Sequence, residues 1–318
     1  MTIAKRMAWQ VLLALFLSRS AAALQSVSVE QSIPDLETTF IRAESEYSTA
    51  SVRVLSRPGP GIQCFFIHGW MHSADRWREL MSRLPADWDL HSIELPGFGE
   101  STIDSARRST VDRCAAMIEG VIAGLRDEAR PSMVVAHSLG GLIALRFTHT
   151  RFDYEVYSAV PVNHLHGWLA YLSFEGVTRC LLRINAALPE QTARRLAWRA
   201  ARRTVSDDSY IDELMITDAL RADPVAAARS AKEINRFSLS ACAWCHRGDP
   251  ADDNRHVMVI HAELDQVVAR EDSERLAAFL GTEVTVIPGS GHTVMNEAAG
   301  EFADLLVEMA NSERPTMD

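Results

Sequence analysis

A serine near the middle of the chain, Ser138, has neighbours that could make its hydroxyl a nucleophile. It follows an apolar run with the pattern of a strand, and Leu139-Gly140-Gly141 opens an amphipathic helical stretch after it. A sharp turn from strand to helix lifts a serine hydroxyl clear of the sheet, and it tolerates only small residues two positions before and after, where Ala136 and Gly140 stand. The backbone N–H of Leu139 would face an incoming carbonyl oxygen. The sequence predicts a nucleophile elbow; the plainer alternative is a helix start without chemistry.

A serine hydroxyl is a poor nucleophile at neutral pH, so it needs a base to accept its proton and a carboxylate to hold that base. The last predicted strand leads into Pro288-Gly289-Ser290-Gly291-His292, a flexible turn that can carry an imidazole over the edge of the sheet. Among the 11 histidines, His292 is therefore the candidate base, whereas His137 is expected to be structural. Two carboxylates, Glu263 and Asp265, follow an earlier apolar run. Asp265 could also cap a helix that begins near Ala269.

Short apolar runs alternate with longer helical patterns from residue 50 onward, which predicts an α/β fold with a mostly parallel sheet flanked by helices. Strands are expected near Ser51–Leu55, Ile62–Ile67, Leu90–Leu95, Met133–Ala136, Val156–Val160, Val257–His261 and Glu283–Ile287. Helices are expected near Ala74–Arg83, Thr110–Arg126, Leu139–His149, Glu271–Leu280 and Glu297–Met309. The alternation stops in 161–250, where helical periodicity predicts an inserted lid. Residues 24–160 and 251–318 would form the core.

Two further loops carry recognisable motifs. The loop after the first buried strand reads His68-Gly69-Trp70, and a later one reads Glu94-Leu95-Pro96-Gly97-Phe98-Gly99-Glu100-Ser101. Together with the Ser138 elbow and the loops that carry Asp265 and His292, they resemble the α/β-hydrolase fold superfamily, in its serine esterase branch with a helical lid. The resemblance covers about residues 50–160 and 250–310 and follows the family's motif order.

The resemblance implies a role for each matching residue. Ser138 would be the nucleophile, Asp265 the acid and His292 the base, since the family's acid lies in a Gly-x-x-Asp loop that Ala262-Glu263-Leu264-Asp265 matches with alanine for glycine. The backbone N–H groups of Trp70 and Leu139 would form the oxyanion hole. Glu263 is the alternative acid, although its spacing departs from the family pattern. The family's reaction requires no cofactor and no metal.

These residues would hydrolyse a carboxylic ester through an acyl-enzyme. A thioesterase, a lactonase, a peptidase, a cofactor-free haloperoxidase or a carbon–carbon bond hydrolase would use the same triad. Aspartate-nucleophile relatives are disfavoured because the elbow residue is Ser138. A receptor that binds its ligand without turnover is the alternative of another class. The His-Gly-Trp and Leu-Pro-Gly-Phe-Gly-x-Ser motifs are also similar to pimeloyl-carrier-protein methyl esterases, whose lid arginines bind an acidic carrier protein.

The predicted lid is rich in arginine. Arg194, Arg195, Arg199, Arg202 and Arg203 recur at helical spacing. They would form either a solvated face paired with Asp207, Asp208, Asp212 and Glu213, or a docking patch for an acidic carrier protein or an anionic surface. A net charge of −10 argues against nucleic-acid binding. The Cys242-Ala243-Trp244-Cys245-His246 run has the spacing of c-type haem attachment, but a local thiol pair explains it more simply, and no further ligands are placed for zinc.

The first 23 residues differ from the rest. Lys5 and Arg6 precede an apolar run from Met7 to Leu17, and Ala21-Ala22-Ala23 follows, which predicts a secretory signal peptide. The run is too short to span about 30 Å of hydrocarbon. A secreted or periplasmic location is therefore expected; the alternative is a cytoplasmic protein, and only that location would suit a carrier-protein partner.

Overall fold

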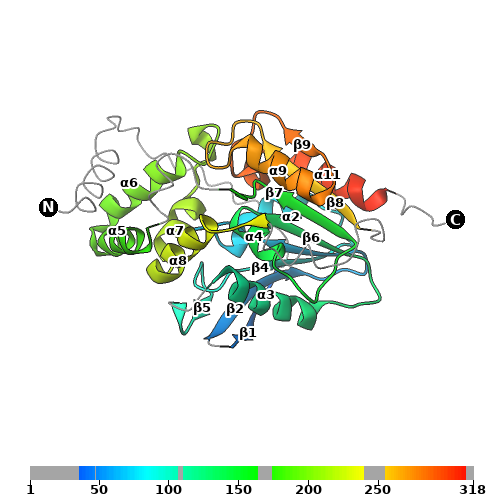
Figure 1. Ribbon diagram of the computed structural model, residues 1–318, viewed down its shortest axis with the longest axis horizontal. Helices are drawn as coiled ribbons and strands as arrows, with labels where there is room; N and C mark the ends of the chain where they lie inside the picture. Colours follow the sequence, from blue (N-terminus) through cyan, green and yellow to red (C-terminus); the bar gives the residue numbers. More distant parts are fainter. Residues whose placement is uncertain (1–35, 47, 107–109, 164–173, 240–254, 313–318) are drawn as a thin grey trace.

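The computed structural model describes residues 36–46, 48–106, 110–163, 174–239 and 255–312. Its centre is a nine-stranded sheet with the order β1-β2-β4-β3-β6-β7-β8-β9, in which β5 pairs with β2 (Figure 1). The strands are β1 (Glu37–Ser45), β2 (Ser48–Arg57), β3 (Gln63–Ile67), β4 (Asp89–Ile93), β5 (Thr102–Ile103), β6 (Ser132–His137), β7 (Tyr154–Ser158), β8 (His256–Ala262) and β9 (Val284–Ile287). All pairs from β4 to β9 are parallel, and β2 is antiparallel to its neighbours. The predicted fold class is therefore confirmed.

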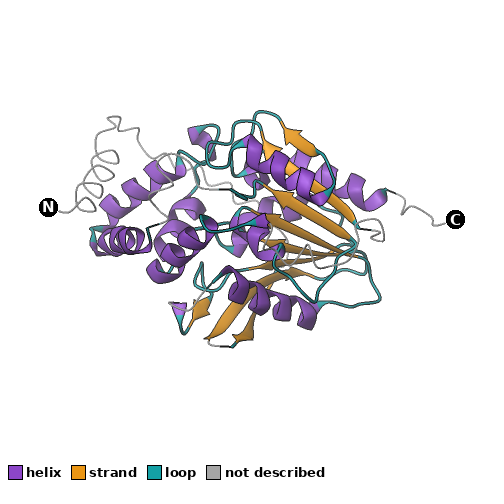
Figure 2. Ribbon diagram, in the orientation of Figure 1, coloured by secondary structure: helices purple, strands orange, loops and turns teal. Residues whose placement is uncertain are grey.

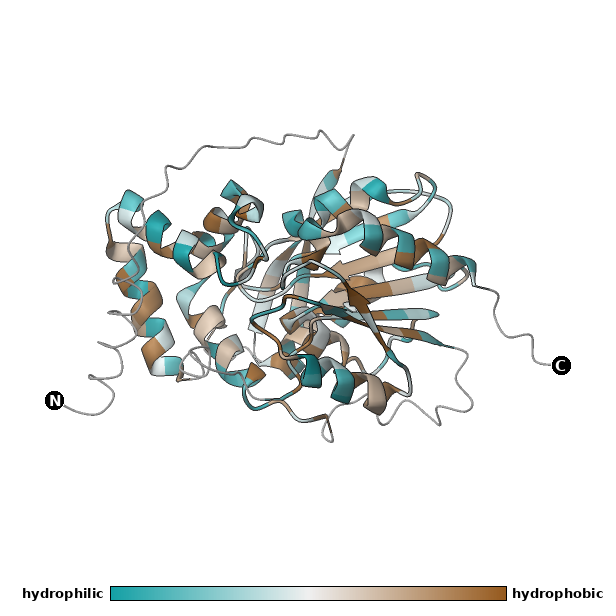
Figure 3. Cartoon of the chain, turned by 90° about the horizontal axis from the view of Figure 1, so that it is seen from above, coloured by the Kyte–Doolittle hydropathy of each residue, from teal (hydrophilic) through white to brown (hydrophobic). Residues whose placement is uncertain are grey.

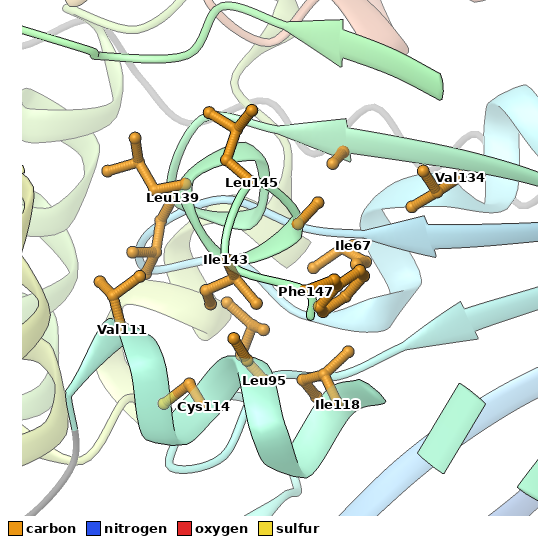
Figure 4. Close-up of a cluster of buried hydrophobic side chains, with 14 of the residues drawn as sticks. Ile67, Leu95, Val111, Cys114, Ile118, Val134, Leu139, Ile143, Leu145 and Phe147 are labelled. Atoms are coloured by element: carbon orange, nitrogen blue, oxygen red, sulfur yellow. The ribbon is translucent and has the colours of Figure 1, made fainter. Parts of the chain in front are cut away.

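Helices cover both faces of the sheet (Figure 2). They are η1 (Ala74–Trp77), α2 (Arg78–Arg83), α3 (Val111–Leu125), α4 (Leu139–Ala144), α5 (Glu175–Ala187), α6 (Glu190–Ala201), η4 (Asp208–Tyr210), α7 (Glu213–Arg221), α8 (Pro224–Ile234), α9 (Arg270–Leu280), α10 (Val294–Glu297) and α11 (Ala299–Asn311). Helices α3, α4 and α9 pack on one face, where Figure 4 shows Cys114 and Ile118 of α3 beside Ile143 of α4. Helices α2, α10 and α11 pack on the other face.

Alternation along the strands divides the apolar side chains between these two layers. In β3, Phe65 and Ile67 belong to the first core, whereas Cys64 and Phe66 belong to the second. Successive side chains of a strand point to opposite faces, so a strand covered on both sides is apolar throughout. Figure 3 shows the resulting concentration of hydrophobic residues on the strands, with hydrophilic residues on the outer helices.

One predicted helix ends earlier than expected. The stretch predicted over Leu139–His149 is helical only as far as Ala144. The buried carboxylate of Glu119, on α3, accepts hydrogen bonds from the backbone N–H groups of Thr148, His149 and Thr150. Those amides cannot also bond carbonyls one turn back, so the chain leaves the helical path.

The helices α5 to α8 lie together beyond one end of the sheet, in the segment predicted to be a lid (Figure 1). Asp223, which caps α8, donates its backbone N–H to the carbonyl of Gly97, in the loop after β4 (2.9 Å). The insertion therefore rests on the edge where the strands end. The predicted signal segment and the Cys242 to His246 run lie outside the described residues. Within the described ranges, no helix combines the length and apolar character that a bilayer crossing needs.

Candidate active site

Ser138 occupies a strained turn between β6 and α4. Its backbone angles are φ 51° and ψ −116°, a region that side-chain-bearing residues avoid at a cost of about 1–3 kcal/mol. The surroundings fix this conformation from both sides: the Ser138 N–H donates to the carbonyl of Ser158 (2.9 Å), and its own carbonyl accepts from the N–H of Gly141 (3.0 Å). The predicted elbow geometry is therefore present at this serine.

The glycines after Ser138 leave no room for a side chain. A Cβ on Gly140 would lie 2.4 Å from the carbonyl oxygen of Ile67, and one on Gly141 would lie 2.3 Å from a methyl carbon of Val160. A Cβ on Gly69 would come within 3.1 Å of the Ser138 Cβ. The His68-Gly69-Trp70 loop therefore lies directly against the elbow, as an oxyanion loop must.

Hydrogen bonds of His68 set the orientation of this loop. The backbone N–H of Leu95 donates to Nε2 of His68 (2.9 Å), so the ring proton is on Nδ1, which donates to the carbonyl of Gly69 (2.8 Å). Burial lowers the pKa of His68 to about 4 and keeps the ring neutral. In a trans peptide the C=O and N–H point in opposite directions, so holding the Gly69 carbonyl turns the Trp70 N–H away from His68.

His292 and Asp265 form a buried pair. Nδ1 of His292 lies 2.8 Å from Oδ2 of Asp265, and neither side chain is more than 6% exposed. The other carboxylate oxygen accepts from the backbone N–H groups of Val267 and Val268 (2.7 and 2.9 Å). Both oxygens of Asp265 are thus held, and Nε2 of His292 is the nitrogen left to accept a proton.

The alternatives for these carboxylates do not hold. Helix α9 begins at Arg270 with Ala269 as its cap and no side-chain cap, so Asp265 caps the turn before the helix rather than the helix itself. Glu263 accepts from the N–H of Gly289 (2.8 Å) and is exposed. Glu263 therefore supports the loop of His292, while Asp265 contacts the imidazole.

The imidazole of His292 lies beside the elbow. Its ring centroid is 4.7 Å from that of His137, the residue that precedes Ser138. In the described part of the chain, the Ser138 hydroxyl and His292 are not hydrogen-bonded; such bonds often tighten only when substrate binds. His137 itself is fully buried and stacks on His72, with centroids 5.8 Å apart. Burial lowers the pKa of both His137 and His72 well below the usual value, as suits packing residues.

A family model described as the Alpha/beta hydrolase family matches residues 64–305, which include the elbow, the His68-Gly69-Trp70 loop and the His292–Asp265 pair. This chain belongs to the alpha/beta hydrolase family. Over 261 residues it is 27% identical to an uncharacterized hydrolase, YugF, of Bacillus subtilis strain 168, covering 75% of this chain and 86% of the relative.

Two further proteins resemble this alpha/beta hydrolase. A pimeloyl-[acyl-carrier protein] methyl ester esterase of Yersinia enterocolitica is 24% identical over 254 residues, which cover 77% of this chain and 91% of the relative. The structure of a thermophilic esterase from Thermogutta terrifontis aligns with a TM-score of 0.65 at 17% identity, over 86% of this chain and 98% of that one. The structural likeness supports the fold.

Two arginines of the predicted lid form ion pairs with acidic residues of the same segment. Arg194 forms an ion pair with Glu213, and Arg202 forms one with Asp208 (2.9 Å). Asp212 instead pairs with Arg76, a fully buried residue of the core (2.6 Å). The solvated-face interpretation is thus correct for two arginines, and docking of an acidic partner stays a prediction.

Two charged residues with long-range contacts, Arg76 and Glu297, were not identified from the sequence. Both lie inside segments that were expected to be helical, and nothing in their local pattern distinguishes them from solvent-exposed helix residues. Among the described residues, no group of three or more His, Cys, Asp or Glu is arranged to hold a metal ion.

Proposed function

We propose that this alpha/beta hydrolase cleaves a carboxylic ester through an acyl-enzyme. The Ser138 hydroxyl attacks the carbonyl carbon while Nε2 of His292 takes the hydroxyl proton and then passes it to the leaving alkoxide. Asp265 holds the imidazole in the tautomer with Nδ1 protonated and stabilises the imidazolium. Water then attacks the acyl-enzyme with His292 as base again, releasing the acid and restoring the serine.

The observation that carries this proposal is the buried His292–Asp265 pair beside a serine in a strained elbow. A structure retains a strained residue only where its surroundings hold it, and such residues cluster at functional sites. A carboxylate that bonds Nδ1 leaves Nε2 basic and directed elsewhere, which a proton-accepting histidine requires.

Two backbone N–H groups would stabilise the oxyanion. The N–H of Leu139 is at the first turn of α4, where it has no partner within the helix. The N–H of Trp70 is turned away from His68 by the bond that holds the Gly69 carbonyl. Removing one such donor from a hydrolase typically lowers kcat by about 10²–10³-fold.

Labelling with a fluorophosphonate probe, followed by a chain-length series of p-nitrophenyl esters, tests the proposal. Wild type and Ser82→Ala, which alters an exposed serine on α2, should be labelled and active. Ser138→Ala should remain folded by circular dichroism, escape labelling and lose ester turnover. Turnover at the wild-type rate in Ser138→Ala would exclude the mechanism, and binding without turnover in wild type would favour a receptor.

A methyl ester on a carrier-protein-bound acyl chain is a second candidate substrate, favoured by the similarity to the Yersinia enterocolitica esterase. Arg195 is exposed on α6 and could meet an acidic partner. In Arg195→Glu, kcat/KM should fall for the carrier-linked ester and stay unchanged for a p-nitrophenyl ester. Equal kcat/KM for carrier-linked and free methyl esters in wild type would rule this substrate out.

A further inference from the structure

The carboxylate of Glu297 joins the loop of His292 to the helical insertion. Glu297 ends α10, the short helix directly after His292. Its Oε2 accepts from the backbone N–H of Gly291 (3.0 Å) and from both the N–H (2.8 Å) and the hydroxyl of Ser206. Its Oε1 accepts from the hydroxyl of Thr293 (2.8 Å). One carboxylate therefore bonds the residues on both sides of His292 and a residue of the insertion.

The two segments that Glu297 joins are in direct contact. A Cβ on Gly291 would lie 2.5 Å from the backbone nitrogen of Ser206 and 2.7 Å from the carbonyl carbon of Val205. The N–H of Thr293 donates to the carbonyl of Thr204 (3.3 Å). Val205 is buried in a separate apolar cluster of the insertion that includes Met215 of α7. A shift of the insertion would therefore be passed to the backbone around His292.

The loop of His292 has little stiffness of its own. Glycines stand at 289 and 291, and Gly289 adopts a positive φ of 66°. Two other carboxylates also hold it: Glu263 through the N–H of Gly289, and Asp265 through the imidazole. Asp265 fixes one point of the ring, so the backbone on either side of His292 must be fixed as well to set the direction of Nε2.

We infer that Glu297 is a positioning residue that couples the docking of the helical insertion to the placement of the His292 imidazole beside Ser138. This inference rests on the proposed function. Glu297 acts through hydrogen bonds to the loop: without its carboxylate, the N–H groups of Gly291 and Ser206 lose their acceptor, and the contact between loop and insertion loosens.

The size of the effect follows from the geometry of proton transfer. A misplacement of about 1 Å at a catalytic group can cost about 10²-fold in rate. Glu297→Ala should lower kcat by about 10- to 100-fold with KM within about threefold of wild type, because the displaced imidazole acts in proton transfer rather than in substrate binding. Glu301→Ala, which removes an exposed carboxylate one turn further along in α11, is the matched control and should keep wild-type kcat.

Glu297→Gln separates hydrogen bonding from charge. The amide oxygen of glutamine can accept from Gly291 and Ser206, while its NH2 group can donate to the hydroxyl oxygen of Thr293. Positioning therefore predicts that Glu297→Gln retains kcat within about fivefold of wild type, with the same pH profile of kcat/KM. A loss as large as that of Glu297→Ala, or a shifted acidic limb, would mean that the charge matters and would overturn the inference.

Gly291→Ala tests the same contact with the Glu297 side chain still present, although the added Cβ would also lie 2.9 Å from Oε1 of Glu297. It keeps the inference testable if Glu297→Ala fails to fold. Its Cβ must push the loop away from Val205 and Ser206, so kcat should again fall by at least about tenfold. An unchanged kcat in Gly291→Ala or in folded Glu297→Ala would overturn the inference.

Proton NMR gives a readout that does not depend on turnover. The Nδ1–H of His292 that bonds Asp265 should give a low-field resonance in wild type and in Glu301→Ala, and this resonance should broaden or vanish in Glu297→Ala. An unchanged resonance together with a lower kcat would contradict positioning. If wild type neither turns over esters nor reacts with fluorophosphonate, the proposed function fails, while the resonance still reports whether Glu297 places the imidazole.

Discussion

The indole nitrogen of Trp70 donates a hydrogen bond to the backbone carbonyl oxygen of Ala227, 2.9 Å away. The residue expected to offer its amide to the oxyanion is thus tied by its side chain to α8, a helix of the insertion. Ala227 is fully buried, as is its neighbour Ala226, and a Cβ on Gly97 would meet the Ala226 methyl at 2.6 Å. The His68-Gly69-Trp70 loop is therefore held against α8.

Trp70→Phe should keep the backbone N–H of residue 70 but lose the bond to α8. The Ala227 carbonyl keeps its helical bond to the N–H four residues further along α8, so the substitution removes one hydrogen bond, worth about 0.5–1.5 kcal/mol. We expect a lower midpoint of urea unfolding and a several-fold lower kcat on a p-nitrophenyl ester, measured beside Trp198→Phe on α6. A kcat equal to that of Trp198→Phe would show that the indole bond does not hold the oxyanion loop.

Gly140, two residues after Ser138 in the elbow, gives a prediction about stability. In Gly140→Ala the new methyl must displace the carbonyls of Ile67 and His68, so the protein should lose more than about 3 kcal/mol of unfolding free energy or fail to fold. In Gly120→Ala, within α3, nothing lies within 4 Å of the added carbon, and a gain of about 0.5–1 kcal/mol is expected. Urea unfolding of Gly140→Ala and Gly120→Ala measures both changes. Equal changes in unfolding free energy would refute the close approach of the backbone at the elbow.

The features predicted correctly from the sequence are those that a short local pattern determines. The strand before Ser138, the small residues around it and the glycine-rich turn before His292 were identified because each is a short continuous segment with its own steric requirement. Glu297 and Arg76 were not, because their partners are distant: 91 residues separate Glu297 from Ser206, and 136 separate Arg76 from Asp212. The early end of α4 likewise depends on Glu119, which no local pattern around α4 could reveal, because that carboxylate belongs to another helix, α3.

Asp218 of α7 should make stability depend on pH. Its side chain is 2% exposed and lies 3.6 Å from Nε of the fully buried Arg76, whose other nitrogens bond Asp212. Burial, which outweighs the attraction of Arg76, raises the pKa of Asp218 to about 7. A carboxyl whose folded-state pKa is raised binds its proton more tightly in the folded protein, so its stabilising effect is complete at low pH and disappears as pH rises towards 7.

Asp218→Asn replaces the protonated acid with a group that does not titrate. Between pH 5 and 8 the wild type should lose on the order of 2 kcal/mol of unfolding free energy relative to the variant, at about 1.4 kcal/mol per pH unit. Urea unfolding at pH 5 and at pH 8 measures this loss of unfolding free energy. Asp212→Asn is the control: it removes a partner of Arg76 and should lower the unfolding free energy at both pH values. A constant difference between Asp218→Asn and wild type would refute the raised pKa.

The buried histidines make stability change with pH in the direction opposite to that of Asp218. Burial lowers the pKa of His72 and His137 well below the usual value and that of His68 to about 4. Below about pH 6.5 the unfolded chain therefore binds protons that the folded protein refuses, and stability falls as the pH drops. These three groups alone give a slope of up to about 4 kcal/mol per pH unit. Burial also lowers the pKa of His91 and His261, which titrate in the same sense.

The Asp218→Asn background makes this slope easier to measure, because it removes one group that titrates in the opposing sense. Burial also raises the pKa of Glu94, which is the same in every variant compared. In this background, His72→Gln, whose side chain stays neutral, should reduce the slope between pH 6 and 5 by about 1.4 kcal/mol per pH unit, roughly one proton. His149→Gln, which alters an exposed histidine, is the variant for comparison. If His72→Gln and His149→Gln have the same slope, the ring of His72 accepts a proton in the folded protein, and its burial against His137 does not keep it neutral in acid.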